Sequence, residues 1–247
     1  MARILLGGWA RAGVLPSQVM VIDPDPAALA QLIESAPVVR VAGLSDVAAA
    51  DIVIVAVPPP AATSTFAQLR DLVTNESVIL SLVPSVPLAR ICQELGDDRQ
   101  VARMIPNAPS IVGAGYNPIA FGAALHGEAR AALLALLAPF GPSPEVPDEQ
   151  LEAYAVLTAM GPTYLWPQFY ALVDLAGKMG LDPGAAMEGL TAMVQGALRT
   201  MTDADLSPQQ IRDLIPARPL AEPVGVISAA YGEILTVLHA RLAGRPQ

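Results

Sequence analysis

Apolar positions in the first half of the chain fall into short runs with helical patterns between them. Asp51–Val57 and Ser77–Val83 are almost continuously apolar, as strands buried on both faces of a parallel sheet are. Three shorter segments also have strand character: Gln18–Ile22, Val38–Ala42 and Val101–Ile105. Helical patterns cover Asp25–Glu34 and about 86–95. This alternation predicts βαβ units and an α/β domain with a parallel sheet.

From about Asp148 onward the strand patterns stop and long helical patterns follow. Gly161-Pro162 and Asp182-Pro183 have proline where a helix begins, and Asp182 is a suitable N-cap. One apolar stripe has helical spacing and predicts core or subunit-interface packing: Met187, Leu190, Val194, Leu198 and Met201. A last helix is expected from about Pro223 to Leu242. The turn Phe140–Pro147, rich in proline and glycine, predicts two domains, 1–146 and 147–247.

Composition narrows the class of protein. Hydrophobic residues make up 53% of the chain and charged residues 15%, which excludes a disordered protein and suits a chain that buries apolar surface between subunits. No uninterrupted apolar run reaches the roughly 18 residues of a membrane span, and the first residues lack a signal-peptide pattern. We therefore expect a cytoplasmic protein without a membrane segment. The net charge of −9 argues against a nucleic-acid partner.

The chain has too few cysteines and histidines for disulfides, thiolate clusters or a histidine-based metal site. Cys92 is the only cysteine, so an intrachain disulfide and a thiolate cluster are excluded. It lies in a predicted helix and is interpreted as a buried, inert thiol. The two histidines, His126 and His239, lie far apart in sequence, and no metal site is predicted.

Several segments, taken in order, resemble pyrroline-5-carboxylate reductases, and together they span essentially the whole chain. The matching segments are 1–15, Ala56-Val57-Pro58-Pro59, Arg103–Pro109 followed by Val112-Gly113, Gly161-Pro162-Thr163-Tyr164, Lys178–Leu181 and Ser207–Gln210. The resemblance implies a Rossmann-like domain that binds NADP or NAD, followed by an all-helical domain for dimerisation and substrate binding. It also implies hydride transfer to the C=N carbon of a cyclic imine, which in the family converts pyrroline-5-carboxylate to proline. The alternative is a catalytically inactive homologue with a binding or regulatory role.

The resemblance assigns cofactor-binding residues to the carboxyl ends of the predicted strands, where parallel sheets bind ligands. Asp23 would accept the adenosine ribose hydroxyls and favour NAD; alternatively it only forms an Asp-Pro turn. Ala56, Val57 and Pro58 would line the cofactor, with Pro58 in place of the family's usual lysine. Asn107 matches the asparagine beside the nicotinamide ribose; alternatively it is only the residue of a Pro-Asn turn.

The resemblance places substrate-binding residues in the helical half. Met160 and Thr163 flank the helix start that faces the substrate in the family, but Thr163 could be only a hydroxyl in the first turn of the helix. The family's Ser-Pro-Gly-Gly-Thr-Thr-like loop, which holds the substrate carboxylate and supplies a proton, is replaced here by Ala217–Pro223. Ala221 and Glu222 occupy the two threonine positions, and Arg218 lies nearby in sequence.

Glu222 changes the chemistry expected of this loop. An ionised Glu222 would repel a substrate carboxylate, whereas a buried, protonated Glu222 could act as a general acid. Arg218 could pair with an anionic group. We therefore hypothesise a substrate other than pyrroline-5-carboxylate, namely a neutral or cationic imine. Alternatively, Arg218 and Glu222 are solvated loop charges and catalysis is lost.

The first family strand and its glycine-rich phosphate loop have no match in this sequence. In the family they precede the segment that here begins at Met1, and Gly7-Gly8 falls inside the helix that follows. Either the protein starts upstream of Met1 or it has lost its dinucleotide site. We expect the former.

Overall fold

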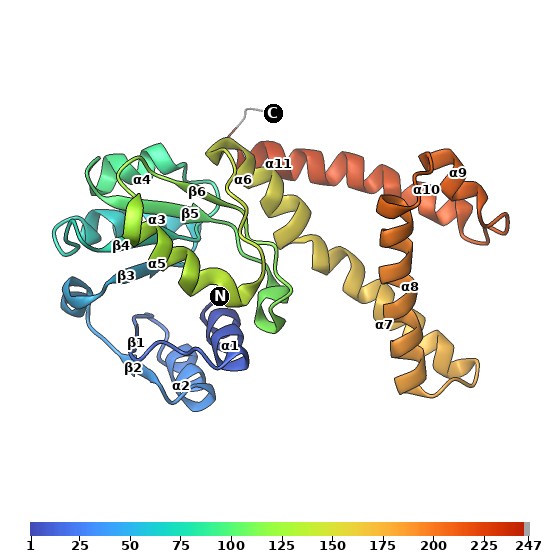
Figure 1. Cartoon of the computed structure of the whole chain (residues 1–247), viewed down its shortest axis with the longest axis horizontal. Helices are drawn as coiled ribbons and strands as arrows, with labels where there is room; N and C mark the ends of the chain where they lie inside the picture. The colour runs from blue at the N-terminus through green and yellow to red at the C-terminus, as the bar shows by residue number, and fades with distance from the viewer. Residues whose placement is uncertain (245–247) are drawn as a thin grey trace. The chain divides into compact units, whose positions relative to one another are not determined.

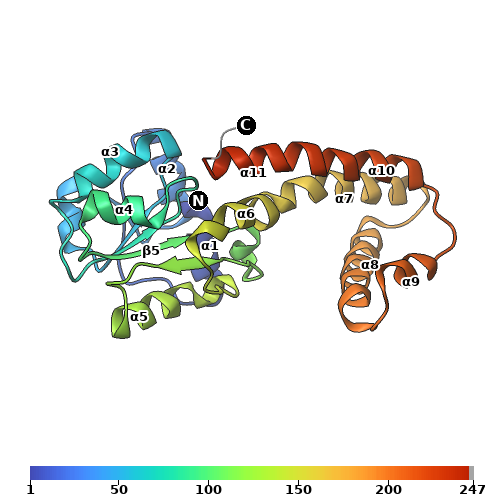
Figure 2. The ribbon, with the colours of Figure 1, turned by 90° about the horizontal axis from the view of Figure 1, so that it is seen from above.

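The computed structural model describes residues 1–244, which form two compact units (Figure 1, Figure 2). Unit 1 comprises Met1–Met160 with the chain from Leu238 onward, and unit 2 comprises Gly161–Val237. The structure thus divides the chain at Met160, later than the turn Phe140–Pro147. The assignment of dinucleotide binding to 1–146, and of dimerisation and substrate binding to 147–247, stays a proposal.

Unit 1 is an α/β structure with parallel strands, as the sequence predicted. Its strands are β1 (Val19–Val21), β2 (Val39–Val41), β3 (Ile52–Val55), β4 (Val78–Ser81), β5 (Gln100–Met104) and β6 (Ile119–Phe121). Its helices are α1 (Ala2–Ala12), α2 (Pro26–Ser35), α3 (Pro59–Leu69), α4 (Leu88–Leu95), α5 (Gly127–Leu137), α6 (Leu151–Tyr154) and part of α11 (Thr236–Leu242).

The strands form two sheets. β1 and β2 pair in parallel, and β3, β4, β5 and β6 form a separate four-stranded sheet in that order. β3, β4 and β5 are parallel, whereas β6 is antiparallel to β5, a pairing that the sequence pattern did not predict. No ladder joins β1 to β3 among the described residues, so the sheets are not hydrogen-bonded to each other.

Apolar side chains fill both faces of the four-stranded sheet. Along β4, Val78 and Leu80 point into a cluster shared with α1 and α5, while Ile79 points into a cluster shared with α3 and α4. This alternation follows from the two-residue period of a strand. It explains why β3 and β4 read as continuous apolar runs, because strands covered by helices on both faces carry little polar surface.

The amino-terminal helix α1 packs closely against two short 3-10 helices, Ala108–Val112 and Ala138–Phe140. Trp9 is buried, with its ring centroid 5.1 Å from that of Phe140, and its Nε1 donates to the Leu136 carbonyl at 2.8 Å. A Cβ added at Gly8 would lie 2.6 Å from the Phe140 ring and 2.9 Å from the Ser110 carbonyl oxygen. The predicted position of Gly8 inside a helix is confirmed, and at this position the absence of a side chain permits the close approach of Phe140.

This packing predicts opposite effects for two glycine-to-alanine changes. Within a helix the change normally stabilises by about 1 kcal/mol. Gly189→Ala in α8 (Pro183–Asp203), where the new methyl meets nothing within 4 Å, should do so. Gly8→Ala should instead destabilise by about 1–3 kcal/mol, because its methyl overlaps Phe140 and the Ser110 carbonyl. Urea unfolding of both variants checks the prediction, and equal stabilisation would contradict it.

Unit 2 is entirely helical. Its elements are α7 (Gly161–Lys178), α8, α9 (Pro208–Asp213), α10 (Ala221–Ala230), the π-helical turn Tyr231–Leu235 and the first residues of α11. The predicted helix starts at Gly161 and Pro183 are confirmed, and the Asp182 carboxylate accepts from the amides of Gly184 and Ala185 as an N-cap.

Within residues 161–237, all of which the structure describes, Ala186 is the only buried residue. The predicted stripe on α8 is largely open to solvent, with Leu198 60% and Met201 65% exposed. The helical stretch Ala221–Leu242 is long and apolar enough to cross a membrane by length and composition alone. Charged residues such as Glu222 and Glu233 interrupt it, so it shows no unbroken apolar run in the sequence.

The three prolines after β3 end the strand, and Pro59 also begins α3, because proline suits the first turn of a helix. The carboxy-terminal helix expected from about Pro223 to Leu242 is confirmed as one continuous helical stretch, in which a π-helical turn joins α10 to α11. A second π-helical turn, Ala155–Ala159, directly follows α6.

Candidate functional site

Three loops follow neighbouring parallel strands at one edge of the four-stranded sheet. Ala56–Pro58 follows β3, 82–87 follows β4, and 105–107 follows β5. Ala56 and Pro58 are exposed, while Val57 packs against the cluster beneath α3. Parallel sheets bind ligands at this edge. The structure therefore brings the predicted cofactor residues Ala56, Val57, Pro58 and Asn107 to a single edge.

Asn107 is buried, and its side chain holds the loop together. Its Oδ1 accepts from the Tyr116 amide at 3.2 Å, and its Nδ2 donates to the Thr158 carbonyl at 3.3 Å. Asn107 thus joins the end of β5 to the π-helical turn that precedes Met160. These contacts give Asn107 a structural role, and its predicted contact with the nicotinamide ribose stays a prediction.

Asp23 lies just after β1, in the two-stranded sheet. Its Oδ1 accepts from the Asp25 amide at 2.9 Å, and Asp25 in turn caps α2 through the Ala27 amide. This is the Asp-Pro turn that the sequence offered as one interpretation. The side chain is exposed, and its predicted role toward the ribose hydroxyls remains a prediction.

The predicted substrate residues lie at the end of unit 1 and in unit 2. Met160 is the last residue of unit 1, and Thr163 lies in the first turn of α7. Ala221 and Glu222 lie in the first turn of α10, where both are exposed. Their substrate-binding and catalytic roles stay predictions.

Arg218 binds a carboxylate of its own chain. Its Nη2 donates to Asp213 Oδ1 at 2.8 Å and to the Arg212 carbonyl at 2.9 Å. Hydrogen bonding from Gln209, together with Arg218, lowers the pKa of Asp213 below its ordinary value. Because both members of the pair are largely solvent-exposed, the pair contributes little to stability.

Cys92 lies in α4 and is half-buried. Burial, and secondarily the negative charges of Asp97 and Asp148, raises the pKa of its thiol. The thiolate is therefore disfavoured, which agrees with the inert role expected from the sequence. Among the residues that the structure describes, no group of histidine, cysteine and carboxylate side chains could hold a metal ion.

Sequence reasoning missed a buried charge cluster beside the three loops. Arg103 lies on β5 with its side chain fully buried, and Asp148 and Glu152 both contact its guanidinium. The available signal was an arginine inside an otherwise apolar strand. The second signal was the spacing of Asp148 and Glu152, which are four residues apart and therefore lie on one face of a helix.

Comparison with known proteins gives one family model, described as NADP oxidoreductase, coenzyme F420-dependent, which matches residues 1–84. The pyrroline-5-carboxylate reductase of Escherichia coli is 25% identical over 231 residues, which is 92% of this chain and 86% of that protein. The pyrroline-5-carboxylate reductase of Pseudomonas aeruginosa is 27% identical over 232 residues, covering 93% of this chain and 83% of the relative.

Solved structures share the fold over nearly the whole chain. The pyrroline carboxylate reductase of Plasmodium falciparum, crystallised with NADP bound, has a TM-score of 0.74 at 15% identity, covering 98% of this chain and 91% of the neighbour. The pyrroline-5-carboxylate reductase of Coxiella burnetii has a TM-score of 0.69 at 23% identity, covering 98% of this chain and 92% of that one.

The fold and these similarities define an oxidoreductase with a Rossmann-like amino-terminal domain and a helical carboxy-terminal region. Within that class, the chain is related to the pyrroline-5-carboxylate reductases along most of its length. The resemblance predicted from the sequence motifs is therefore confirmed.

Proposed function

We propose that this protein reduces the C=N bond of a cyclic imine with NADP as its cofactor, in the manner of a pyrroline-5-carboxylate reductase. The similarity to reductases of that name, over 92% of the chain, carries the proposal. The NADP-dependent family that matches residues 1–84 supports the choice of cofactor over NAD. The inactive alternative has no observation in its favour.

The residues at the sheet edge suit a dinucleotide. Exposed Ala56 and Pro58 offer backbone and apolar surface after β3, and the loop after β4 lies next to them in the sheet order. We assign Ala56, Val57, Pro58 and Asn107 to the nicotinamide half. The exposed Asp23 is left with its Asp-Pro turn, because a carboxylate beside the adenosine ribose would favour NAD and repel the 2′-phosphate of NADP. A bound cofactor would supply the hydride, while the chain binds and orients both reactants.

The substrate loop supports a substrate without a carboxylate. Arg218 already pairs with Asp213, and Ala221 and Glu222 stand where the family has hydroxyls. We therefore propose an imine that is neutral, or that carries a positive charge outside its C=N group, with Met160, Thr163 and Ala221 as substrate-binding residues. Glu222 is exposed within unit 2, and it would deliver the proton to the imine nitrogen once its carboxyl is enclosed with the substrate and held protonated. That assignment balances the reaction, since the hydride goes to the carbon and the proton to the nitrogen.

The test of the proposed reaction is NADPH consumption with two imines that differ only in a carboxylate, 1-pyrroline and pyrroline-5-carboxylate. Turnover of either imine with NADPH supports imine reduction, and a higher kcat/KM for 1-pyrroline supports the neutral substrate. A preference for pyrroline-5-carboxylate would refute the proposed substrate but not the reaction. Turnover of neither, by a folded protein, would refute the reaction itself.

Substitution of Glu222 tests its proposed role. Because general acid catalysis contributes about 10²–10⁴-fold, Glu222→Gln should lower kcat by at least about 100-fold with little change in substrate KM. Glu188→Gln, an exposed glutamate on α8, is the matched control and should leave kcat unchanged. Wild-type kcat in Glu222→Gln would show that Glu222 is a solvated loop charge.

We also propose that the protein is a cytoplasmic homodimer, or a larger assembly of dimers, formed through unit 2. A helical unit of 77 residues in which only Ala186 is buried has no core of its own, and hydrophobic association requires burial of its apolar faces. A second copy would cover the stripe on α8 and the apolar helical stretch Ala221–Leu242. Contact with a second copy accounts for the exposed apolar surface of unit 2 and does not require a membrane.

Sedimentation velocity tests the assembly. The wild-type protein should sediment as a dimer or larger, and Leu198→Glu in the exposed stripe should shift it toward monomer by placing a charge in the interface. Val14→Glu, at a position 51% exposed in unit 1, should leave the assembly intact. A monomeric wild-type protein at micromolar concentration would contradict the proposal.

A further inference from the structure

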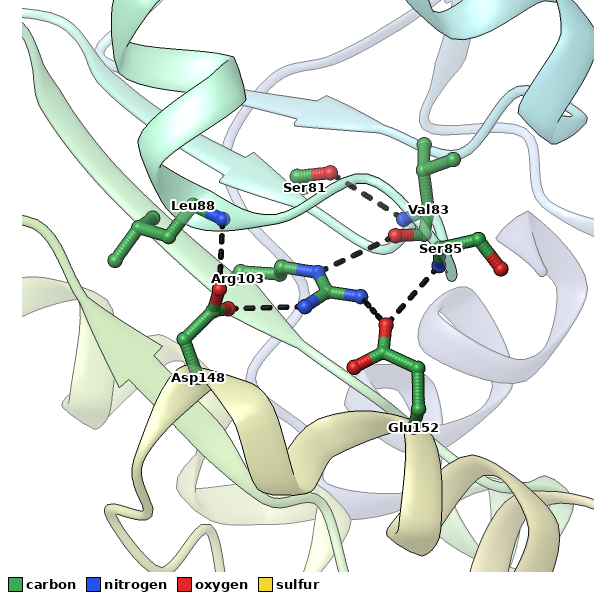
Figure 3. A network of polar contacts seen from close by, with 7 residues as sticks. All are labelled: Ser81, Val83, Ser85, Leu88, Arg103, Asp148 and Glu152. Atoms are coloured by element: carbon green, nitrogen blue, oxygen red, sulfur yellow. Dashed lines mark hydrogen bonds and ion pairs between the residues drawn. The ribbon is translucent and has the colours of Figure 1, made fainter. Parts of the chain in front are cut away.

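The buried cluster of Arg103, Asp148 and Glu152 has no part in the function described so far. The Arg103 side chain is 0% exposed, and those of Asp148 and Glu152 are 23% and 7% exposed. Arg103 Nη1 donates to Asp148 Oδ1 at 2.9 Å, and Arg103 Nη2 donates to Glu152 Oε1 (Figure 3). Two carboxylates thus compensate one buried guanidinium.

The cluster also holds the backbone of the loop after β4. Ser85 N donates to Glu152 Oε1 at 3.1 Å, and Leu88 N donates to Asp148 Oδ2 at 2.8 Å (Figure 3). Arg103 Nε donates to the Val83 carbonyl at 3.5 Å. All three charged side chains therefore reach the same short segment, 83–88.

The backbone in this loop adopts an uncommon conformation. Ser85 has φ of 65°, one of two positive-φ residues other than glycine in the described chain. A residue with a Cβ persists in that conformation only where its surroundings fix it. The hydrogen bond from its amide to Glu152 supplies this constraint, because Glu152 is itself fixed by Arg103.

Stability does not explain why ionic groups are used here. A buried ion pair is often no more stabilising than apolar residues of the same volume, because desolvation offsets the attraction between the charges. The cluster begins at Arg103 on β5, the strand that leads to Asn107, and lies between the loop after β4 and the helical segment that carries Asp148 and Glu152 (Figure 3). Its geometric effect is to hold that loop in one shape where a ligand would bind.

We propose that Glu152, acting through Arg103 and the Ser85 amide, is a positioning residue for the dinucleotide cofactor. It fixes the loop 82–87 in the shape that binds the cofactor, and it contacts neither cofactor nor substrate. The inference rests on the proposed reductase function. Its effect should therefore appear in cofactor affinity more than in the chemical step.

The test combines steady-state kinetics with hydrogen exchange on the full-length protein. Glu152→Gln should raise the KM for NADPH at least tenfold, with less than a threefold change in imine KM, and should speed amide exchange at Ser85 at least tenfold. Glu152→Asp keeps the charge and should partly restore both quantities. Glu94→Gln, the partner of Arg90 in an ion pair on α4, is the control and should change neither.

Circular dichroism first establishes that each variant is folded. A folded Glu152→Gln with wild-type KM for NADPH would overturn the inference while leaving the reductase function intact. Unchanged exchange at Ser85 would overturn it as well, whether or not the protein turns over an imine. Failure of the wild-type protein to bind NADPH would instead refute the proposed function, and with it the cofactor role of the loop.

Discussion

Arg103→Ala is expected to destabilise unit 1 by about 3–5 kcal/mol, because it leaves the buried Glu152 carboxylate and the partly buried Asp148 carboxylate without their positive partner. Glu152 is 7% exposed, and its contacts are the guanidinium and the Ser85 amide. The change also removes the donor to the Val83 carbonyl. Urea unfolding measures the effect as a lower midpoint with an unchanged slope.

Arg90→Ala is the matched control for this prediction. Arg90 pairs with Glu94 at 2.6 Å one helical turn away, but its side chain is 51% exposed. Exposed pairs contribute about 0–1 kcal/mol, so the midpoint should barely move. Equal effects of the two substitutions would show that the Arg103 cluster is hydrated rather than buried.

Gly141→Ala is expected to destabilise unit 1 by about 2–6 kcal/mol, from two causes that act together. Gly141 has φ of 109° and ψ of −175°, a region open essentially to glycine alone, and occupying it costs other residues about 1–3 kcal/mol. The added methyl would also lie 2.2 Å from the Gly115 carbonyl oxygen. Backbone cannot move aside as a side chain tip can, so about 1–3 kcal/mol of overlap adds to the strain.

Gly13→Ala separates these two causes. Gly13 ends α1 with φ of 70°, but a Cβ there meets nothing within 4 Å. Only the conformational cost of roughly 1–2 kcal/mol remains. Thermal or urea unfolding should show that the Gly141→Ala variant is much less stable than the Gly13→Ala variant. Comparable losses would mean that the loop around Gly115 relaxes freely.

The parts of the fold that the sequence predicted are those with local signals. β3 and β4 were recognisable as continuous apolar runs, and α8 through Asp182 and Pro183 at its start. The antiparallel strand β6 was missed because its partner β5 was interpreted as the last strand of a parallel pattern. The division at Met160 was not apparent because α6 and α7 follow each other with only a π-helical turn between them.

Residues of the candidate site were likewise predictable only where a local sequence motif marks them. Motifs compared in order along the chain located Ala56–Pro58 and Asn107, which the structure brings to one sheet edge. Asn107's internal hydrogen bonds to Tyr116 and Thr158 could not be foreseen, because they join segments up to 51 residues apart. The Arg103 cluster escaped for the same reason, since its carboxylates come 45 and 49 residues later.

The packing of α1 has a consequence for the order in which the chain acquires its structure during synthesis. The apolar face of α1, with Leu5, Leu6 and Trp9, is buried partly against Phe140, and Trp9 bonds to a carbonyl 127 residues later. At about 5–20 residues per second, a ribosome needs roughly 6–25 s to make that stretch. Through that interval the face lacks the partners that Leu136 and Phe140 supply, so α1 is only partly covered and the nascent chain is open to aggregation and to chaperone binding there.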